Sequence, residues 1–175
     1  SVENAAMANA IFAHATEYED DSFPEMTSSY TILFPVLGLG EKVKASGKAL
    51  IEAFVVGNEV QSRIGIACLE ARRHGYLNLS LSGTLGVAAA SAKLLKLDAQ
   101  RTAMALSLAA SQGSGIVRQT GTMAHYFEMG VAGRNGLGAA LLASDGFTGN
   151  PNILEASRGF FELVTCGKVT APEDV

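Results

Sequence analysis

Residues 48–75, KALIEAFVVGNEVQSRIGIACLEARRHG, constrain the fold of this chain more than any other stretch. Apolar residues recur there every three or four positions with charged residues between them, which is the pattern of an amphipathic helix. Two arginines and a histidine end the run, where cations oppose the negative end of a helix dipole, and Gly75 follows as a cap. The segment therefore predicts a long helix whose apolar face other helices must cover.

The rest of the chain shows the same periodicity. Further helices are predicted over 3–15, from about Leu33 to Gly47, and over 84–97, 98–112, 127–146 and 152–164. Pro35 fits only a first helical turn, and Asp98 is a plausible cap for the helix that follows it. Residues 76–86 alternate as a short strand would, but their glycines favour a loop that leads into a helix. The expected fold class is all-α.

Small residues set how closely these helices approach each other. The chain holds 19 glycines and no tryptophan, and it is 48% hydrophobic and 17% charged. That balance is typical of a packed domain rather than a disordered chain. The glycine-bounded stretch 130–140 predicts tight helix packing, within one chain or across a dimer. We expect one helical domain over residues 1–175.

Charge and cysteine content exclude several classes of protein. A net charge of −4 and a pI near 5.3 give no electrostatic footprint for nucleic acid or an anionic membrane. The apolar run 102–117 is interrupted by polar residues and is shorter than the ~20 residues of a membrane span, so a buried helix explains it better. Cys68 and Cys166 lie far apart without CxxC spacing, which predicts neither a disulfide nor a zinc site and favours the cytoplasm.

The polar stretch 13–31, AHATEYEDDSFPEMTSSYT, carries five acids between Glu17 and Glu25. Crowded carboxylates repel one another, which raises at least one pKa and can create a proton shuttle near neutral pH. A solvated turn between helices explains the same residues without chemistry. The stretch lacks the glycine that a calcium loop requires, so no metal site is predicted.

Two further residues are candidates for chemistry. His125 follows a glycine-rich bend, where it could act as a general base or be a partly buried, hydrogen-bonding histidine. Arg118 lies in the glycine-rich segment before it and could hold a carboxylate. His14, at the end of the first helix, is interpreted as a structural residue that favours the helix dipole.

Three stretches together resemble the helical domain of the MmgE/PrpD family: residues 9–21, 83–115 and 121–161. The resemblance covers nearly all of the chain. It implies the larger, all-helical domain of a homodimeric lyase or isomerase, such as a 2-methylcitrate dehydratase, that acts on small polycarboxylates without a cofactor. In that family a second α+β domain closes over the site, so the chain is expected to be a fragment of a longer two-domain protein.

The chain departs from the family motifs at several functional positions. In the family motif HAxDYDD, the aspartates correspond to Glu17, Glu19 and Asp20, and Asp21 follows. The histidine of the family's HPS corresponds to Thr27, and the histidine of GFHxT corresponds to Leu77. The lysine and histidine of GTMxKxLHxG correspond to His125 and Glu128. One lost catalytic acid or base typically costs ~10²–10⁴ in rate.

The resulting hypothesis is a lyase or isomerase of a small carboxylate with a reassigned set of proton-transfer groups. His125 is the candidate base, and Tyr76 or Asp21 is its acid partner. The predicted substrate-binding residues are Glu17, Asp20, Thr27, Ser28, Ser29, Leu77 and Arg118. The alternative is a catalytically inactive helical scaffold that keeps the fold for dimerisation.

Overall fold

The computed structural model describes residues 1–21, 27 and 29–170, and over these the chain folds into helices joined by turns and loops. The α-helices are α1 (Val2–His14), α2 (Leu33–Val43), α3 (Gly47–Ala67), α4 (Asn78–Leu94), α5 (Ala99–Ala110), α6 (Met123–Ser144) and α7 (Phe160–Thr165). Two 3₁₀ helices, η1 (Leu69–His74) and η2 (Val117–Gln119), connect them. The expected all-α class is confirmed. Among the described residues, β pairing is limited to one isolated bridge between Tyr76 and Ile116.

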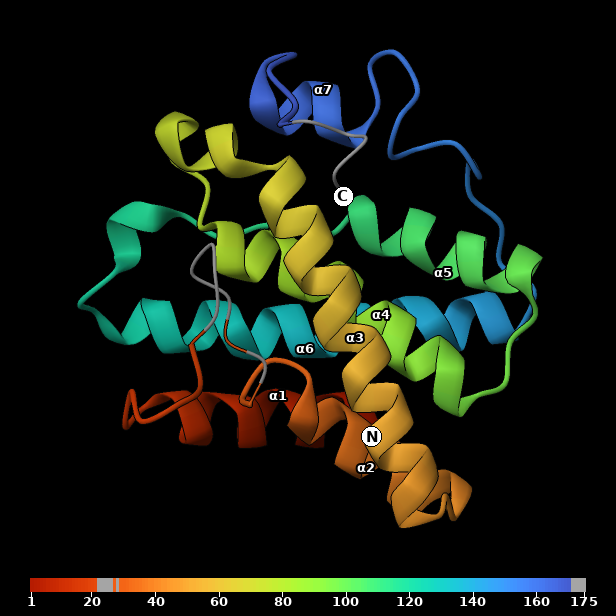
Figure 1. Ribbon diagram of the computed structural model, residues 1–175. Coiled ribbons are helices and arrows are strands. Elements are labelled where there is room, and N and C mark those ends of the chain that lie inside the picture. Colours follow the sequence, from red (N-terminus) through yellow and green to blue (C-terminus); the bar gives the residue numbers. More distant parts are fainter. Residues whose placement is uncertain (22–26, 28, 171–175) are drawn as a thin grey trace.

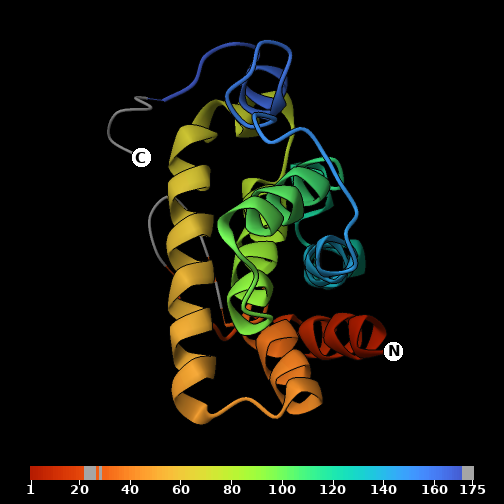
Figure 2. The same ribbon diagram turned by 90° about the vertical axis from the view of Figure 1, so that its right-hand side faces the viewer.

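Helix α4 is the centre of the domain. It lies between α3 and α6, as Figure 2 shows, and it also contacts α2 and α5. Every α4 residue except Leu79 and Lys93 is buried, as expected of a helix covered on all sides. Two of its buried hydroxyls bond within the helix: the Ser82 side chain donates to the Asn78 carbonyl at 2.8 Å, and the Thr84 side chain donates to the Ser80 carbonyl at 3.0 Å.

The contact between α3 and α4 depends on two facing glycines. A Cβ atom on Gly57 would lie 2.9 Å from the carbonyl oxygen of Gly86, and one on Gly86 would lie 2.8 Å from the carbonyl oxygen of Gly57. Real Cβ atoms essentially never approach a backbone oxygen this closely. The two backbones therefore touch directly, which confirms the tight packing predicted from the small residues.

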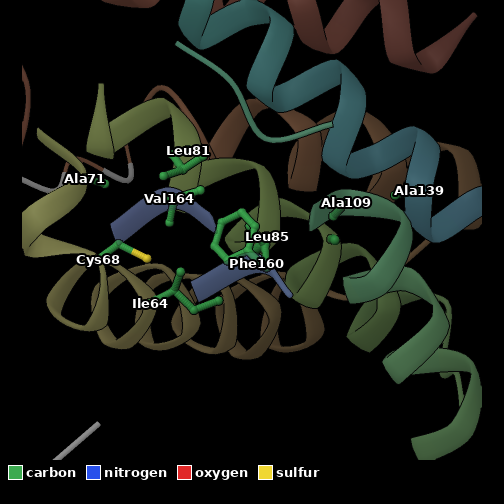
Figure 3. Packing of buried hydrophobic residues seen from close by; sticks show 10 residues of the cluster. Ile64, Cys68, Ala71, Leu81, Leu85, Ala109, Ala139, Phe160 and Val164 are labelled. Atoms are coloured by element: carbon green, nitrogen blue, oxygen red, sulfur yellow. The ribbon is translucent and has the colours of Figure 1, made fainter. Parts of the chain in front are cut away.

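Helix α7, near the end of the chain, covers the C-terminal part of α3 and the N-terminal part of α4. Phe160 and Val164 of α7 point into a cluster formed with Ile64 of α3 and Leu81 and Leu85 of α4 (Figure 3). The cluster buries large apolar side chains from segments about 80 residues apart in sequence. Apolar burial of this kind contributes about 25 cal/mol per Å², so α7 is held mainly by hydrophobic contact.

Several predicted boundaries were wrong. The second helix ends at Val43, where Lys44 adopts a left-handed conformation (φ 54°), and Gly47 opens α3 beneath the Ser46 cap instead of closing α2. The predicted helix over 48–75 stops at Ala67 and continues as η1, although Gly75 is the cap at its end as expected. The Asn78 side chain donates to the Gly65 carbonyl at 2.9 Å, which satisfies an acceptor that the broken helix exposes.

Other elements also begin elsewhere than predicted. Residues from Asn78 onward form α4 directly, so neither the strand nor the loop expected over 76–86 extends beyond Leu77. The predicted helix over 152–164 forms only from Phe160, because Arg158 is left-handed (φ 59°) and Gly159 is extended. Asp98 caps α5 as predicted, since its side chain accepts the Arg101 N–H at 2.8 Å.

The two cysteines are free: Cys68 is buried and Cys166 is exposed. Within the described residues, no helix has both the length and the apolar character that crossing a bilayer demands.

The Gly57–Gly86 contact predicts a large packing penalty for a single methyl group. Gly86→Ala should lower the free energy of unfolding by about 1–3 kcal/mol, since the added Cβ has no room against the α3 backbone. Gly138→Ala in α6 is the matched control, because nothing lies within 4 Å of its Cβ position, and it should raise stability by about 0.5–1 kcal/mol. Urea unfolding monitored by circular dichroism measures both. Equal effects of the two substitutions would contradict the close approach.

Candidate functional site

The site forms where the end of α1 meets the start of α6. The two helices pack against each other, with α1 below α6 in Figure 1. Their close approach is permitted by Gly130, because a Cβ atom there would lie 2.8 Å from the carbonyl oxygen of Met7. Since His14 and His125 also meet, the helices run antiparallel and bring residues about 110 positions apart into contact.

The core of the site is a pair of buried imidazoles. His14 is the last residue of α1 and is 1% exposed, and His125 lies in the first turn of α6 and is 8% exposed. Their ring centroids are 4.7 Å apart, with an interplanar angle of 62°. Tyr30 stacks on His14 at 4.0 Å, and Tyr126 meets the same ring edge-on at 5.3 Å. Aromatic neighbours thus hold the His14 ring in place.

The helix predicted over 127–146 left His125 outside it, whereas α6 begins at Met123. The bend ends at Thr122, and the histidine belongs to the helix. A side chain in the first turn of a packed helix is held more firmly than one on a loop. His125 therefore presents its ring to His14 from a fixed backbone position.

The two imidazoles are buried without satisfying their polar atoms. The Nδ1 atoms of both histidines find no hydrogen-bond partner among the described residues. Burial lowers the pKa of His14 to about 4, and the neighbouring His125 adds to this effect. His14 is therefore neutral at pH 7, with a ring nitrogen able to accept a proton or a hydrogen bond.

The acidic stretch turns back onto this pair. Glu17 adopts a left-handed conformation (φ 48°), and its N–H donates to the His14 carbonyl at 3.0 Å, which closes a turn just after α1. One carboxylate oxygen of Glu17 and one ring nitrogen from each histidine lie within 4.8 Å of one another. Glu17, the first acid of this stretch, therefore lies beside both histidines.

The neighbouring acids extend the site toward Ser29. The Asp20 carboxylate accepts the Ser29 N–H at 2.9 Å, which ties the two ends of the acidic stretch together. The pKa of Glu19 is raised, first by burial and then by the nearby carboxylates of Glu17, Asp20 and Asp21. Glu19 is half-buried, whereas Asp21 is exposed. Ser28, a predicted substrate-binding residue, lies outside the described residues.

Two of the predicted substrate-binding residues, Thr27 and Leu77, are buried in the protein interior. Thr27 is 6% exposed, and its carbonyl accepts from the Gln61 side chain at 3.3 Å. Leu77 is 5% exposed and belongs to a small apolar cluster with Tyr30 and Met129. Because Tyr30 also stacks on His14, Leu77 gives the surroundings of the histidine pair an apolar side.

Tyr76 and Arg118 are placed apart from the pair. Tyr76 packs against the cluster that contains Cys68 and Phe160, and its backbone bridges to Ile116. Arg118 is exposed on η2. None of the contacts described for these two residues reaches His125 or Asp21, and their predicted roles stay predictions. Glu128 has a structural contact, since its carboxylate accepts the Ile116 N–H at 2.8 Å.

A separate groove of about 990 Å³ lies between α3, α5 and α7. Its walls are mostly apolar, with Val60, Ile64, Leu106 and Phe161 among them, and it contains none of the predicted site residues. Charged residues also line the groove, Arg63, Glu155, Arg158 and Glu162, but no histidine is among its lining residues. Groups that can move a proton near neutral pH converge instead at the histidine pair with its carboxylate neighbour, which is the candidate site.

Sequence reasoning missed the importance of His14. A signal was present, since Ala6, Ala10 and His14 are spaced four apart and are the buried residues of α1. A histidine that continues the buried face of a helix is a core residue or a site residue, not a solvated helix end. That spacing could have paired it with the other candidate groups.

Fold and site together define an all-α domain with a histidine–carboxylate site between its first and sixth α-helices. The chain belongs to the MmgE/PrpD family, because the family model described as the MmgE/PrpD N-terminal domain matches residues 1–173. This confirms the family resemblance found in the sequence.

The chain is similar in sequence to several proteins named as cis-aconitate decarboxylases or as similar to them. The human enzyme is 33% identical over 162 residues, which cover 89% of this chain and 34% of the enzyme. The Aspergillus terreus enzyme is 33% identical, covering 96% of this chain and 36% of its own length. A cis-aconitate decarboxylase-like protein of Aspergillus oryzae is 32% identical, over 97% of this chain and 38% of its length. The chain thus spans about a third of the length of these relatives.

The neutral, buried His14 predicts a specific loss of stability in acid. The unfolded chain binds the proton near pH 6.5 and the folded one only near pH 4, so stability falls between these values as the pH drops. At about 1.4 kcal/mol per pKa unit, the full loss amounts to about 3 kcal/mol. Urea unfolding from pH 7.5 to 4 should show a smaller decline in His14→Gln than in the parent protein.

The matched control is His74→Gln, at an exposed position on η1. It should leave the pH dependence of the unfolding free energy unchanged. A parent and a His14→Gln protein with parallel pH profiles would show that His14 is not held neutral by the fold.

Proposed function

We propose that this chain is the helical part of a lyase that acts on a small carboxylate by proton transfer, in the manner of a cis-aconitate decarboxylase. The observation that carries the proposal is the buried pair His14 and His125 beside the carboxylate of Glu17. Membership of the MmgE/PrpD family and the names of its relatives support the reaction class.

The chemistry asks for a group that moves a proton beside a carboxylate. Removing CO₂ leaves an electron pair on carbon that must be protonated, and an elimination begins by removing a proton from such a carbon. His125 is the base or acid in this proposal, because its ring is fixed in α6 and a ring nitrogen lacks a partner among the described residues. Neutral His14 orients that ring and accepts or returns the proton.

The acid partner is a carboxyl group of residues 17–21. Asp21 and Tyr76 were the candidates from sequence, and Glu19 meets the requirement better than either. Its pKa is raised by burial and by its acidic neighbours, so it carries a proton at a higher pH than an exposed carboxyl group does. Tyr76 packs against a different cluster.

The substitutions at Thr27 and Leu77 bear on the substrate. The family resemblance places histidines at both positions, where they would offer donors and positive charge to a polyanion. In this chain Thr27 is a buried hydroxyl residue, and Leu77 is part of an apolar cluster. We infer a substrate with fewer carboxylates than a tricarboxylate, and with an apolar group that contacts Leu77. Ser28, Ser29, Asp20 and Arg118 remain proposed binding residues.

The second candidate function is a catalytically inactive scaffold of the same fold. The two lost histidine positions favour it, because each loss of a catalytic acid or base lowers the rate ~10²–10⁴-fold. Both candidate functions include a homodimer, which the family resemblance implies. We also propose that the protein is cytoplasmic and that it needs no cofactor.

Proton exchange separates the two functions. The protein that carries this domain should catalyse CO₂ release or deuterium incorporation with at least one of a panel of di- and tricarboxylates that includes cis-aconitate. His125→Ala should lower this rate by ~10²–10⁴-fold, because the proton-transfer group is removed. Mass spectrometry of the products in D₂O measures it.

His74→Ala, at an exposed position on η1, is the control and should keep the parent rate. No exchange with any of these acids, together with no thermal shift on adding them, would support the scaffold instead. An unchanged rate in His125→Ala would remove this residue from the mechanism.

A further inference from the structure

The histidine pair and Glu17 also have the composition of a metal site. Two imidazoles and one carboxylate each offer a ligand atom, and these atoms lie within 4.8 Å of one another. The two histidine ligands are about 110 positions apart in the sequence and are fixed by α1 and α6, while Glu17 is exposed and adjustable. In a tetrahedral zinc site with Zn–N bonds of about 2.0 Å, ligand atoms are about 3.3 Å apart, so the three side chains would have to draw closer around a bound ion.

The buried nitrogens give an independent reason to expect a ligand. His14 is 1% exposed, and its Nδ1 and that of His125 have no hydrogen-bond partner among the described residues. A buried polar atom left unsatisfied costs about 1–3 kcal/mol, so native proteins seldom keep one without a purpose. A bound ion, or a substrate group, would remove that cost.

The chemistry of these groups favours a cation. A neutral imidazole offers a lone pair, and the two buried imidazoles lie with their ring centroids 4.7 Å apart. Glu17 supplies a negative charge, and the exposed carboxylates of Asp20 and Asp21 nearby in the sequence add to the negative potential around it. Nitrogen and carboxylate ligands together suit zinc and similar divalent transition metals better than calcium or magnesium, which prefer oxygen alone.

The backbone at Glu17 brings the third ligand into range. A non-glycine residue with positive φ is uncommon, and here the left-handed turn redirects the chain just after His14. The N–H of Glu17 donates to the carbonyl of His14, so ligand and helix end are hydrogen-bonded neighbours. An extended Glu17 would instead carry its carboxylate away from the end of α1.

We propose that His14, Glu17 and His125 form a binding site for one divalent transition-metal ion of the zinc type. Three protein ligands leave a fourth position open for water or for a carboxylate. If the proposed function holds, the ion occupies the lone pairs that proton transfer requires, and zinc is then a reversible inhibitor that competes with the reaction. Binding itself does not depend on any activity.

Zinc binding tests the site directly. Purified protein at pH 7.5, titrated with Zn²⁺ against a chromogenic chelator, should bind one ion per chain. Glu17→Gln should weaken binding at least ~10-fold, as expected when a ligand or its close support is lost. Asp21→Asn removes the same charge from the same stretch without removing a ligand, and it should change the affinity less than ~3-fold because exposed charges are screened.

His14→Gln and His125→Gln should weaken binding by at least as much as Glu17→Gln. Because both histidines are buried, circular dichroism must first show that each variant is folded, and the exposed position of Glu17 keeps the test decisive if they are not. Co²⁺ in place of Zn²⁺ should give visible absorption bands in the parent protein that Glu17→Gln abolishes.

Two results would overturn the site: no saturable zinc binding by the parent protein, or an equal loss of affinity in Glu17→Gln and Asp21→Asn. The second would mean diffuse attraction to an acidic surface. Because the titration contains no substrate, a failure of the proposed lyase function leaves its outcome intact. Saturable zinc binding without inhibition of proton exchange would overturn the competition between metal and reaction.

Discussion

The antiparallel contact between α1 and α6 is the constraint on which the candidate site depends. It is made possible by Gly130, where any side chain would meet the backbone of α1 at Met7. Further along α6, Gly133 faces Pro35 of α2 and Gly136 faces Val87 of α4. Successive turns of α6 therefore pack closely against α1, α2 and α4. Since α6 is the element that these three helices share, its glycines fix where the end of α1 lies, and with it His14.

Over the described residues, the site is built by burial on helix faces. Both imidazoles lie on helix faces that continue the core, and Tyr30 and Leu77 provide their apolar neighbours. Such surroundings keep His14 neutral and leave ring nitrogens without partners among the described residues. The same physical condition serves a proton-transfer group and a metal ligand, because both require an accessible lone pair.

The departures from the family motifs concentrate on the side of the site that would meet an anion. Leu77 and Thr27 stand where the family resemblance places histidines, whereas the acidic stretch keeps its carboxylates and gains a neighbour in His125. The local charge is therefore more negative than the motifs imply. This suits a substrate with fewer carboxylates, and it also suits a cation.

The sequence alone determined the fold class, because helical periodicity and small residues leave few other ways to bury the apolar faces of these segments. It also identified Asp98 as a cap and Gly75 as the end of the long run. It could not locate the start of α4, since alternation over 76–86 is overridden by burial on every side of that helix. Nor could it identify the partner of His125. Pairing with His14 depends on helix register across about 110 residues, and no local pattern encodes a contact that only the packing of α1 on α6 creates.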